Sequence, residues 1–295
     1  MPLACKADAQ REFTFMYNMS FYEKFEKIQK GEKMAKTLLK WPGGKRWIIP
    51  FLIPILDKYK TFPIVELFAG GAALSFFVEA KEAILNDKNP HLINFYRQIQ
   101  RGVDIFSVGV NFENDEKTFY NNRDMFNELI AQGKQDTPES AALFYYLNKT
   151  AYNGLMRFNA KGFFNTPFGR HKSINYTFDV EAYQRLFKNW KFTNEDFEDV
   201  KVPSQALVYA DPPYDVEFTH YNAGGFDWGE QVRLVRYLRT LSNPMVLSNQ
   251  ATERIVSLYK SYDFKLTFEK APRFISCKKR EKVEEVIAYR NISLI

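Results

Sequence analysis

A short apolar run ends at Asp211-Pro212-Pro213-Tyr214, which sets a carboxylate beside an aromatic ring. Residues 206–210 are typical of a buried β-strand, and the two prolines must end it because proline has no N–H for the ladder. Ligands in open α/β sheets bind at the carboxyl ends of strands. Oxygen acceptors next to an aromatic ring suit a flat ring with an exocyclic NH2 group. The motif predicts such a site; the alternative is a proline-terminated strand without function.

A second group of candidate residues follows the strand-like run 64–68. Gly70 and Gly71 allow a close backbone approach, and the helix expected after them supplies unpaired N–H donors. Asp87 ends the next strand-like run about 20 residues after Glu66, the separation at which an acidic residue meets ribose hydroxyls. This turn has neither a dinucleotide nor a P-loop pattern. It predicts a nucleoside cofactor without a pyrophosphate; a plain glycine turn with a surface aspartate is the alternative.

The elements that must position these residues alternate along the chain. Four strand-like runs are each followed by a helical pattern: 64–68, 83–85, 206–210 and 245–249. Such alternation predicts an α/β fold with a parallel sheet. Two late strand-like segments, near 264–268 and 283–289, are expected to complete it.

The alternation stops between residues 106 and 180. Helical patterns at 121–132 and 140–148 precede a Gly- and Asn-punctuated segment, 152–165, which predicts a β-hairpin. Residues 1–33 also lie outside the pattern and are expected to form a loosely packed arm. The predicted organisation is therefore an N-terminal arm at 1–33, a sheet domain at 34–105 and 181–295, and an insert at 106–180.

Composition narrows the class of protein. The 295 residues include 41 Lys and Arg against 35 Asp and Glu, and the net charge of +6 suits a polyanion only if the excess gathers on one face. No apolar tract is long enough to cross a bilayer, and no signal peptide is expected. Cys5 and Cys277 cannot form a disulfide framework, and three scattered histidines offer no metal-ligand spacing. We expect no metal and a reducing cytoplasm.

Several motifs in order resemble those of the Dam-like DNA adenine-N6 methyltransferases, the D12 class or alpha group. They are LKWPGGK (39–45), VELFAGGA (65–72) and DPPY (211–214), with YNGLMRFN (152–159) and FNTPFGR (164–170) similar to the family's target-recognition hairpin. FTHY (218–221) and LSN (247–249) also match. The resemblance covers roughly residues 36–290. It implies a Rossmann-like S-adenosylmethionine-dependent methyltransferase sheet, with residues 106–180 as its target-recognition domain.

The resemblance also implies roles for single residues. Asp211 and the Pro212 carbonyl would accept hydrogen bonds from the target adenine's amino group, Pro213 completes the motif, and Tyr214 would stack on the flipped base. The implied cofactor-binding residues are Trp41, Lys45, Phe68, Gly70, Gly71, Asp87, Asp196, Phe197 and Asp211. Among these, Lys45 would lie near the cofactor's carboxylate, and Asp196 with Phe197 near its adenine.

The family's DNA contacts fall on the insert and on the first motif. The implied DNA-binding residues are Lys40, Asn153, Leu155, Arg157, Pro167, Arg170 and Lys172. The forked side chain of Arg157 suits a guanine edge, whereas Leu155 and Pro167 could meet a thymine methyl. Arg170 and Lys172 suit phosphates, as does the run 278–280, for which a solvated surface run is the alternative.

These residue types agree with the chemistry that the resemblance implies. The lone pair of adenine's amino nitrogen is delocalised into the ring. When Asp211 and a carbonyl accept hydrogen bonds from its N–H groups, they favour a pyramidal nitrogen whose lone pair can attack a sulfonium methyl. Positioning and electrostatics would then carry catalysis without a covalent intermediate. Whether Asp211 takes the departing proton is left open. Extruding the adenine from the stack costs roughly a few kcal/mol, which pocket contacts must offset.

The predicted function is site-specific DNA adenine-N6 methylation within a short duplex site. GATC is the candidate sequence, although the loop after Tyr214 is shorter than in the best-known Dam enzymes. The alternatives are methyl transfer to an RNA adenine or a protein glutamine, whose enzymes more often carry Asn in place of Asp211, and a catalytically silent DNA-binding module. Double-stranded DNA is the expected partner, with a cognate restriction endonuclease as a functional partner.

Overall fold

The computed structural model describes residues 36–215, 225–271 and 283–292. The arm predicted at 1–33 lies outside the described residues. So do the motif at 218–221, most of the short loop after Tyr214, and the basic run 278–280.

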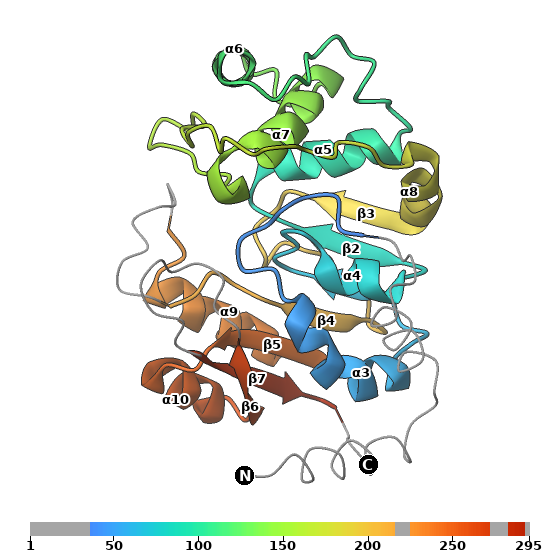
Figure 1. The fold of residues 1–295 in the computed structure, drawn as a ribbon. Helices are drawn as coiled ribbons and strands as arrows, with labels where there is room; N and C mark the ends of the chain where they lie inside the picture. The colour runs from blue at the N-terminus through green and yellow to red at the C-terminus, as the bar shows by residue number, and fades with distance from the viewer. Residues whose placement is uncertain (1–35, 216–224, 272–282, 293–295) are drawn as a thin grey trace, which may run out of the picture.

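Seven strands form one mixed sheet in the order β3-β2-β1-β4-β5-β7-β6 (Figure 1). The strands are β1 Ile64–Glu66, β2 Ala83–Asn86, β3 Trp190–Thr193, β4 Leu207–Ala210, β5 Met245–Gln250, β6 Lys265–Ala271 and β7 Val283–Arg290. The five strands from β3 to β5 pair in parallel, whereas β7 runs antiparallel to both β5 and β6. This topology confirms the predicted Rossmann-like α/β sheet.

Helices connect the strands and begin at residues suited to the task. The α-helices are α3 Ile49–Lys58, α4 Ala73–Val78, α5 Pro90–Gln100, α6 Glu116–Ala131, α7 Pro138–Thr150, α8 Val180–Leu186, α9 Trp228–Thr240 and α10 Glu253–Ser261. At the start of α5, for example, the Asn89 side chain accepts hydrogen bonds from two backbone N–H groups, and Pro90 takes the first helical position. Thr252 caps α10 in the same way.

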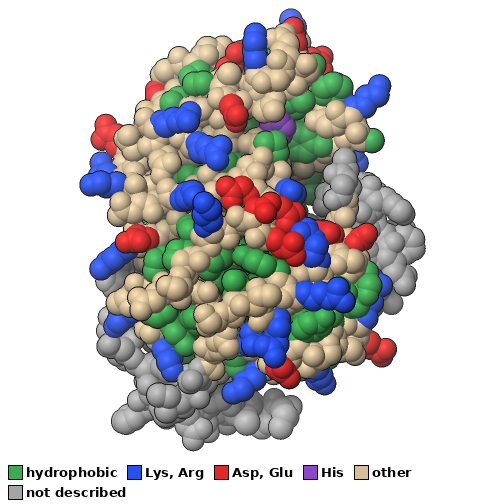
Figure 2. Space-filling model, turned by 180° about the vertical axis from the view of Figure 1, so that it is seen from behind, with side chains coloured by type: hydrophobic (Ala, Val, Ile, Leu, Met, Phe, Trp, Pro, Cys, Tyr) green, Lys and Arg blue, Asp and Glu red, His purple; other side chains and the backbone are tan. Residues whose placement is uncertain are grey.

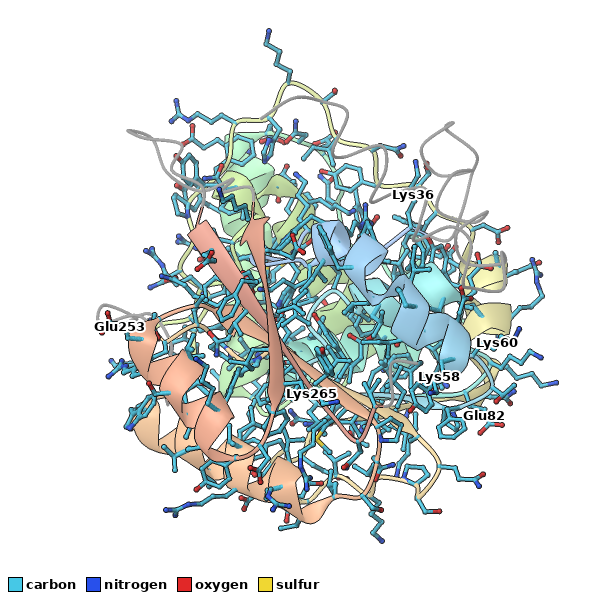
Figure 3. The ribbon with its side chains drawn as sticks, turned by 90° about the horizontal axis from the view of Figure 1, so that it is seen from below. Lys36, Lys58, Lys60, Glu82, Glu253 and Lys265 are labelled. Carbon is cyan, nitrogen blue, oxygen red and sulfur yellow. The ribbon has the colours of Figure 1, made fainter. Side chains whose placement is uncertain are left out.

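The sheet lies between two layers of helices. Because alternate residues of a strand face opposite sides, Leu207 and Tyr209 of β4 belong to the core that contains α3, α4 and α5. Val208 and Ala210 belong to the core that contains α9 and α10. Figure 3 shows this arrangement from the β6 edge, with α3, ending at Lys58, and α10, starting at Glu253, on opposite sides of the strands.

The insert predicted at 106–180 is mounted on α5. Figure 1 shows α6 and α7 beyond the β3 edge of the sheet, with α5 between. Phe95 of α5 stacks on Tyr145 of α7 with ring centroids 5.5 Å apart. The predicted hairpin segment folds back on itself through isolated bridges, Ala151 to Phe168 and Phe158 to Phe164, rather than through regular strands. One continuous hydrophobic core therefore joins the insert to the sheet.

Candidate active site at the carboxyl ends of β1 and β4

The candidate site lies where the strand order of the sheet reverses. β1 pairs in parallel with β2 on one side and with β4 on the other, so the chain leaves β1 and β4 toward different halves of the sheet. Binding crevices form at such switch points, outside the carboxyl ends of the strands. The glycine turn follows β1 and Asp211 follows β4, which brings two predicted motifs to the same edge.

Asp211 is held in a defined orientation at the end of β4. Its Oδ1 accepts a hydrogen bond of 2.9 Å from the Ser248 hydroxyl of β5, and that hydroxyl lies 3.0 Å from the Tyr209 hydroxyl. The Lys45 ammonium lies 3.4 Å from the same carboxylate oxygen. The side chain of Asp211 is 19% exposed, so the carboxylate is supported from the sheet and still reaches the edge of the site.

Lys45, Tyr214 and Glu285 form a buried network beside Asp211. The Lys45 ammonium donates to the Tyr214 hydroxyl over 2.7 Å and makes an ion pair with Glu285 of β7. The Tyr214 hydroxyl in turn donates to Glu285 over 3.0 Å. Lys45 Nζ also lies 4.5 Å from the centre of the Tyr214 ring. The structure thus joins the first motif to the DPPY motif through a strand that neither motif contains.

Burial and charge change the acidity of these groups. Burial raises the pKa of Asp211 to about 6, with Glu285 acting in the same direction and Lys45 against it. For Lys45, burial alone lowers the pKa, but Asp211 and Glu285 raise it above its usual value overall. Burial raises the pKa of Tyr214 to about 12, so its hydroxyl keeps its proton and can donate to Glu285. Near neutral pH the network therefore contains ionised Asp211 and protonated Lys45.

The backbone of the DPPY segment is supported from α9. The buried amide of Gln231 donates to the Pro213 carbonyl over 2.8 Å. The Asn249 side chain at the end of β5 donates to Gln231 over 3.2 Å and thereby orients its amide. The LSN motif at 247–249 thus supplies two supports, because Ser248 holds Asp211 and Asn249 holds Gln231.

The glycine turn after β1 packs tightly against Trp41. Gly70 has a positive φ of 46°, and a Cβ there would lie 2.7 Å from two atoms of the Trp41 ring. Asp87, which follows β2, accepts hydrogen bonds of 2.9 Å from the backbone N–H groups of Gly70 and Asn89. A Cβ on Gly71 would lie 3.2 Å from Trp41. Trp41, both glycines and Asp87 are therefore brought together, and their cofactor-binding roles stay predictions.

Glu66 anchors the same turn from inside the sheet. It is 2% exposed, and one carboxylate oxygen accepts hydrogen bonds from the backbone N–H and the hydroxyl of Ser75 in α4, at 2.9 and 2.5 Å. Burial raises the pKa of Glu66 to about 7, although both bonds to Ser75 act in the opposite direction. Two carboxylates thus fix the turn between β1 and α4. Asp87 binds its start at Gly70, and Glu66 binds Ser75 in the helix that follows.

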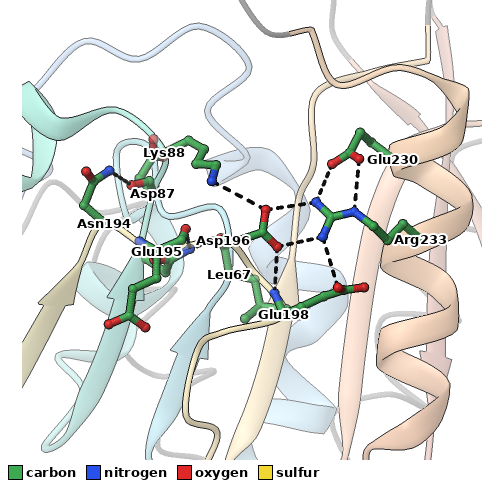
Figure 4. Close-up of polar contacts among 10 residues, drawn as sticks. Leu67, Asp87, Lys88, Asn194, Glu195, Asp196, Glu198, Glu230 and Arg233 are labelled. Carbon is green, nitrogen blue, oxygen red and sulfur yellow. Dashed lines mark hydrogen bonds and ion pairs between the residues drawn. The ribbon is translucent and has the colours of Figure 1, made fainter.

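Aromatic rings and an ionic cluster form the next part of the site. The Phe68 and Phe197 rings have centroids 5.7 Å apart, and Arg233 of α9 lies 4.1 Å from the centre of the Phe197 ring. Arg233 binds both carboxylate oxygens of Asp196, at 2.7 and 2.9 Å (Figure 4). This guanidinium holds the pKa of Asp196 well below its usual range. Asp196 is therefore committed to an ion pair, while Phe197 contributes a ring.

Lys40 reaches the hairpin through a close backbone approach. The Asn148 side chain of α7 brackets Lys40, accepting from its N–H over 2.9 Å and donating to its carbonyl over 2.7 Å. Gly154, at φ +64°, leaves the space that Lys40 fills, since a Cβ there would lie 2.8 Å from Lys40 Cβ. The Lys40 ammonium bonds the Lys149 carbonyl, and burial together with Lys40 lowers the pKa of Lys149 to about 8. Lys149 is a cation that the sequence analysis did not single out.

The remaining predicted DNA contacts differ in how they are held. Asn165 fixes Arg157 through bonds of 2.8 Å to its side-chain oxygen and 3.2 Å to its carbonyl. By contrast, Arg170 is exposed and pairs with Glu116 of α6 at 3.2 Å. Exposed side chains at the same hairpin are Asn153, Pro167 and Lys172, and Leu155 is half-buried. The DNA-binding roles of these residues stay predictions.

Charge is mixed on the face of the molecule that points away from the viewer in Figure 1. Figure 2 shows the face behind that of Figure 1, with Lys and Arg side chains scattered over it and acidic side chains gathered near its middle. The basic excess therefore does not form a continuous basic surface on that face. Among the described residues, no group of three or more His, Cys, Asp and Glu is arranged to hold a metal ion. No helix in the described ranges is long and apolar enough to cross a membrane.

Sequence reasoning missed Glu285 and Gln231, as well as Lys149 and Arg233. Glu285 lies two residues before Ile287 in β7, so both side chains point to the same face of the sheet, and Ile287 is buried in the core with α3. The alternating pattern therefore predicts an apolar residue where the chain has a carboxylate. That mismatch is the signal that could have identified it. Gln231 carries no comparable signal, because a polar residue near the start of a helix is ordinary.

One family model and several known proteins match most of the chain. The family model described as D12 class N6 adenine-specific DNA methyltransferase matches residues 41–273. The chain is 35% identical over 248 residues to the Type II methyltransferase M.CviBI of Paramecium bursaria Chlorella virus NC1A, covering 81% of this chain and 92% of that protein. It is 33% identical to the Type II methyltransferase M.MjaIII of Methanocaldococcus jannaschii, covering 83% and 94%. For the DNA adenine methylase of Serratia marcescens the identity is 32%, covering 87% and 98%.

Proposed function

The chain belongs to the D12 class N6 adenine-specific DNA methyltransferases, and we propose that it moves the methyl group of S-adenosylmethionine to an adenine flipped out of a short duplex site. DNA adenine-N6 methylation follows from the family. The cofactor, the flipped base and the roles of single residues are the proposal.

The observation that carries the proposal is the environment of Asp211. Its carboxylate stands at the switch point of the sheet, held by Ser248 and Lys45 and next to the turn that contains Gly70. An ionised carboxylate in this position can accept a hydrogen bond from an N–H of adenine's amino group, which keeps the nitrogen lone pair available. The Tyr214 ring beside it suits stacking on an extruded base, and such contacts offset a flipping cost of roughly a few kcal/mol.

The residues around the glycine turn fit the proposed cofactor. S-adenosylmethionine supplies an electrophilic sulfonium methyl when it is bound. Asp87 makes one hydrogen bond to a backbone N–H through each carboxylate oxygen, which leaves acceptor capacity for ribose hydroxyls. The partly buried Phe68 ring suits an adenine ring and packs against the buried Phe197, and Trp41 closes the turn at Gly70. Because Lys45 is paired with Asp211 and Glu285, its predicted contact with the cofactor's carboxylate requires an exchange of partners.

Site recognition is proposed to lie with Lys40 and the hairpin. Asn165 presents the Arg157 guanidinium in a fixed orientation, which supports bidentate reading of a guanine edge. GATC is the first sequence to test. Two relatives are named Type II methyltransferases, which supports a functional link to a restriction endonuclease. A DNA substrate also favours the predicted cytoplasmic location.

Expression of the full chain in a methylation-deficient host tests the proposal directly. Plasmid and genomic DNA would be read by single-molecule sequencing for N6-methyladenine. The proposal expects the modified base at one recurring short motif, which also gives the recognition site. Soluble, folded protein without modified adenine in DNA would contradict it and direct the search to an RNA adenine, a protein glutamine or a silent DNA-binding role.

A further inference from the structure

We propose that Glu285 is a positioning residue of the active site, which fixes the Tyr214 ring and the Lys45 ammonium beside Asp211. This inference deepens the proposed function and rests on it, because Tyr214 and Asp211 are the groups proposed to receive the target adenine. Glu285 belongs to β7, outside every motif that identifies the family in this sequence.

The first support is the burial of Glu285. Its side chain is 1% exposed, and a buried carboxylate is costly unless paired and hydrogen-bonded. Both oxygens have partners, since Oε1 pairs with Lys45 and Oε2 accepts from Tyr214. Among the described residues, each oxygen of the Glu285 carboxylate thus has a partner that belongs to the site. A residue with only a packing role at this strand position would be apolar, like its neighbours Val286 and Ile287.

The second support is what the two bonds do to Tyr214. Its hydroxyl accepts from Lys45 and donates to Glu285, so the end of the ring is held from two sides. A ring fixed in this way offers a stacking surface that need not be ordered when the base arrives, which reduces the entropy lost on binding. Without Glu285, Lys45 alone would hold the hydroxyl.

The third support is charge. Asp211, Lys45 and Glu285 together carry one net negative charge when ionised, and positive charge develops on the amino nitrogen as it attacks a sulfonium methyl. The titratable groups that face Asp211 are Lys45, Glu66, Tyr209, Tyr214, Tyr259 and Glu285. Glu285 is one of the groups that raise the pKa of Asp211, after burial, so its neutralisation should lower that pKa.

Glu285→Gln in the full chain is the direct test, with Glu284→Gln as its matched control. Glu284 is the preceding residue of β7 and is exposed, so the control makes the same charge change away from the site. We expect Glu285→Gln to lower kcat about tenfold or more, with the KM for duplex DNA changed less than about twofold. We also expect the acidic limb of its kcat profile to move to lower pH. The control should match wild type in all three.

A measurement without DNA separates the two proposals. With tyrosine labelled by 13C at Cζ, the Tyr214 resonance is assigned by its loss in Tyr214→Phe. Glu285→Gln should shift that resonance in the free protein and Glu284→Gln should not. An unmoved resonance, or wild-type kcat with an unmoved limb, overturns the role of Glu285. Wild-type protein that never methylates DNA overturns the proposed function instead, whatever the resonance does.

Tyr214→Phe tests the same bond from its other end if Glu285→Gln does not fold. It keeps the ring and removes only the hydroxyl that Glu285 and Lys45 hold. The inference expects a lower kcat with duplex binding retained, and a smaller effect of Glu285→Gln in that background where the double variant folds. Wild-type kcat in Tyr214→Phe would overturn it.

Discussion

The Lys45 ammonium lies 3.4 Å from the Asp211 carboxylate, so a residue of the first motif favours the ionised form of the aspartate in the DPPY motif against the effect of burial. Because the proposal needs an ionised Asp211 to accept one hydrogen bond from the amino group, and burial raises the pKa of Asp211 to about 6, activity should be lost as pH falls through that value. The profile of kcat against pH from 5 to 9 checks this. A limb near the ordinary aspartate value of about 4 would contradict the assigned environment.

The companion variant Lys45→Met should move that limb to higher pH, because it removes the attraction that stabilises ionised Asp211. It leaves Asp211 and Glu285 without their shared cation, and breaking a buried pair costs about 3–5 kcal/mol. Unfolding must therefore be measured first. Lys60→Met, an exposed lysine just after α3 (Figure 3), is the control and should leave the limb unmoved.

Gly70→Ala should disrupt the turn that is proposed to bind the cofactor. The new Cβ would lie 2.7 Å from the Trp41 ring, and φ of 46° is strained for a side chain. Gly43→Ala is the control, because Gly43 also has a positive φ of 79° but has open space around it. Both variants should lose about 1–2 kcal/mol of stability from the backbone. Only Gly70→Ala should also lose cofactor affinity in calorimetry; equal affinities would refute the steric role of Trp41.

Much of the fold could be predicted because the strongest signals were local. The runs that became β1, β2, β4 and β5 ended within about two residues of their predicted limits, as expected for buried strands bounded by turn residues. By contrast, β3 was missed, since Trp190–Thr193 is four residues long and carries an exposed Lys191. Pro54 inside α3 likewise hides that helix from pattern reasoning.

The candidate site was predictable only as far as its motifs. Gly70 and Asp87 meet because the parallel strands β1 and β2 bring their carboxyl ends to one edge, a rule that needs no coordinates. Glu285 enters the site only because β7 inserts antiparallel between β5 and β6, and no local pattern specifies that strand order. The ion pair that occupies Asp196 was equally invisible, since Arg233 lies on a distant helix.

Arg233→Met should destabilise the protein at neutral pH and much less in acid. Arg233 keeps the pKa of Asp196 below its unfolded value, so this stability is present above pH of about 4 and is lost as pH falls. Both partners are partly exposed, which limits the loss to about 1 kcal/mol plus a contribution from the Phe197 ring. Urea unfolding at pH 7 and pH 3 measures it. An equal loss at both values would argue against the pair, as would the same profile in Arg236→Met, a control on the same helix whose exposed side chain bonds the Tyr262 hydroxyl.

Arg157→Ala should relax the choice of site more than it slows turnover at the best site. A bidentate contact to a base is worth about 1–3 kcal/mol of discrimination, and Asn165 already orients the guanidinium for one. Methylation rates on duplexes that differ by one base pair give the loss. The matched control is Arg170→Ala, whose exposed side chain pairs with Glu116 and should affect sequences uniformly. An unchanged preference in Arg157→Ala would refute the reading role.

Asp211 is proposed to activate the amino group of adenine, while the residues around the glycine turn supply most of the cofactor's contacts. Single-turnover methyl transfer by Asp211→Ala, together with calorimetry of cofactor binding, tests it most directly. We expect a rate lower by about 10²–10³ on duplex DNA, with cofactor affinity retained. Unimpaired transfer by Asp211→Ala would contradict it, as would a loss of rate explained entirely by lost cofactor binding.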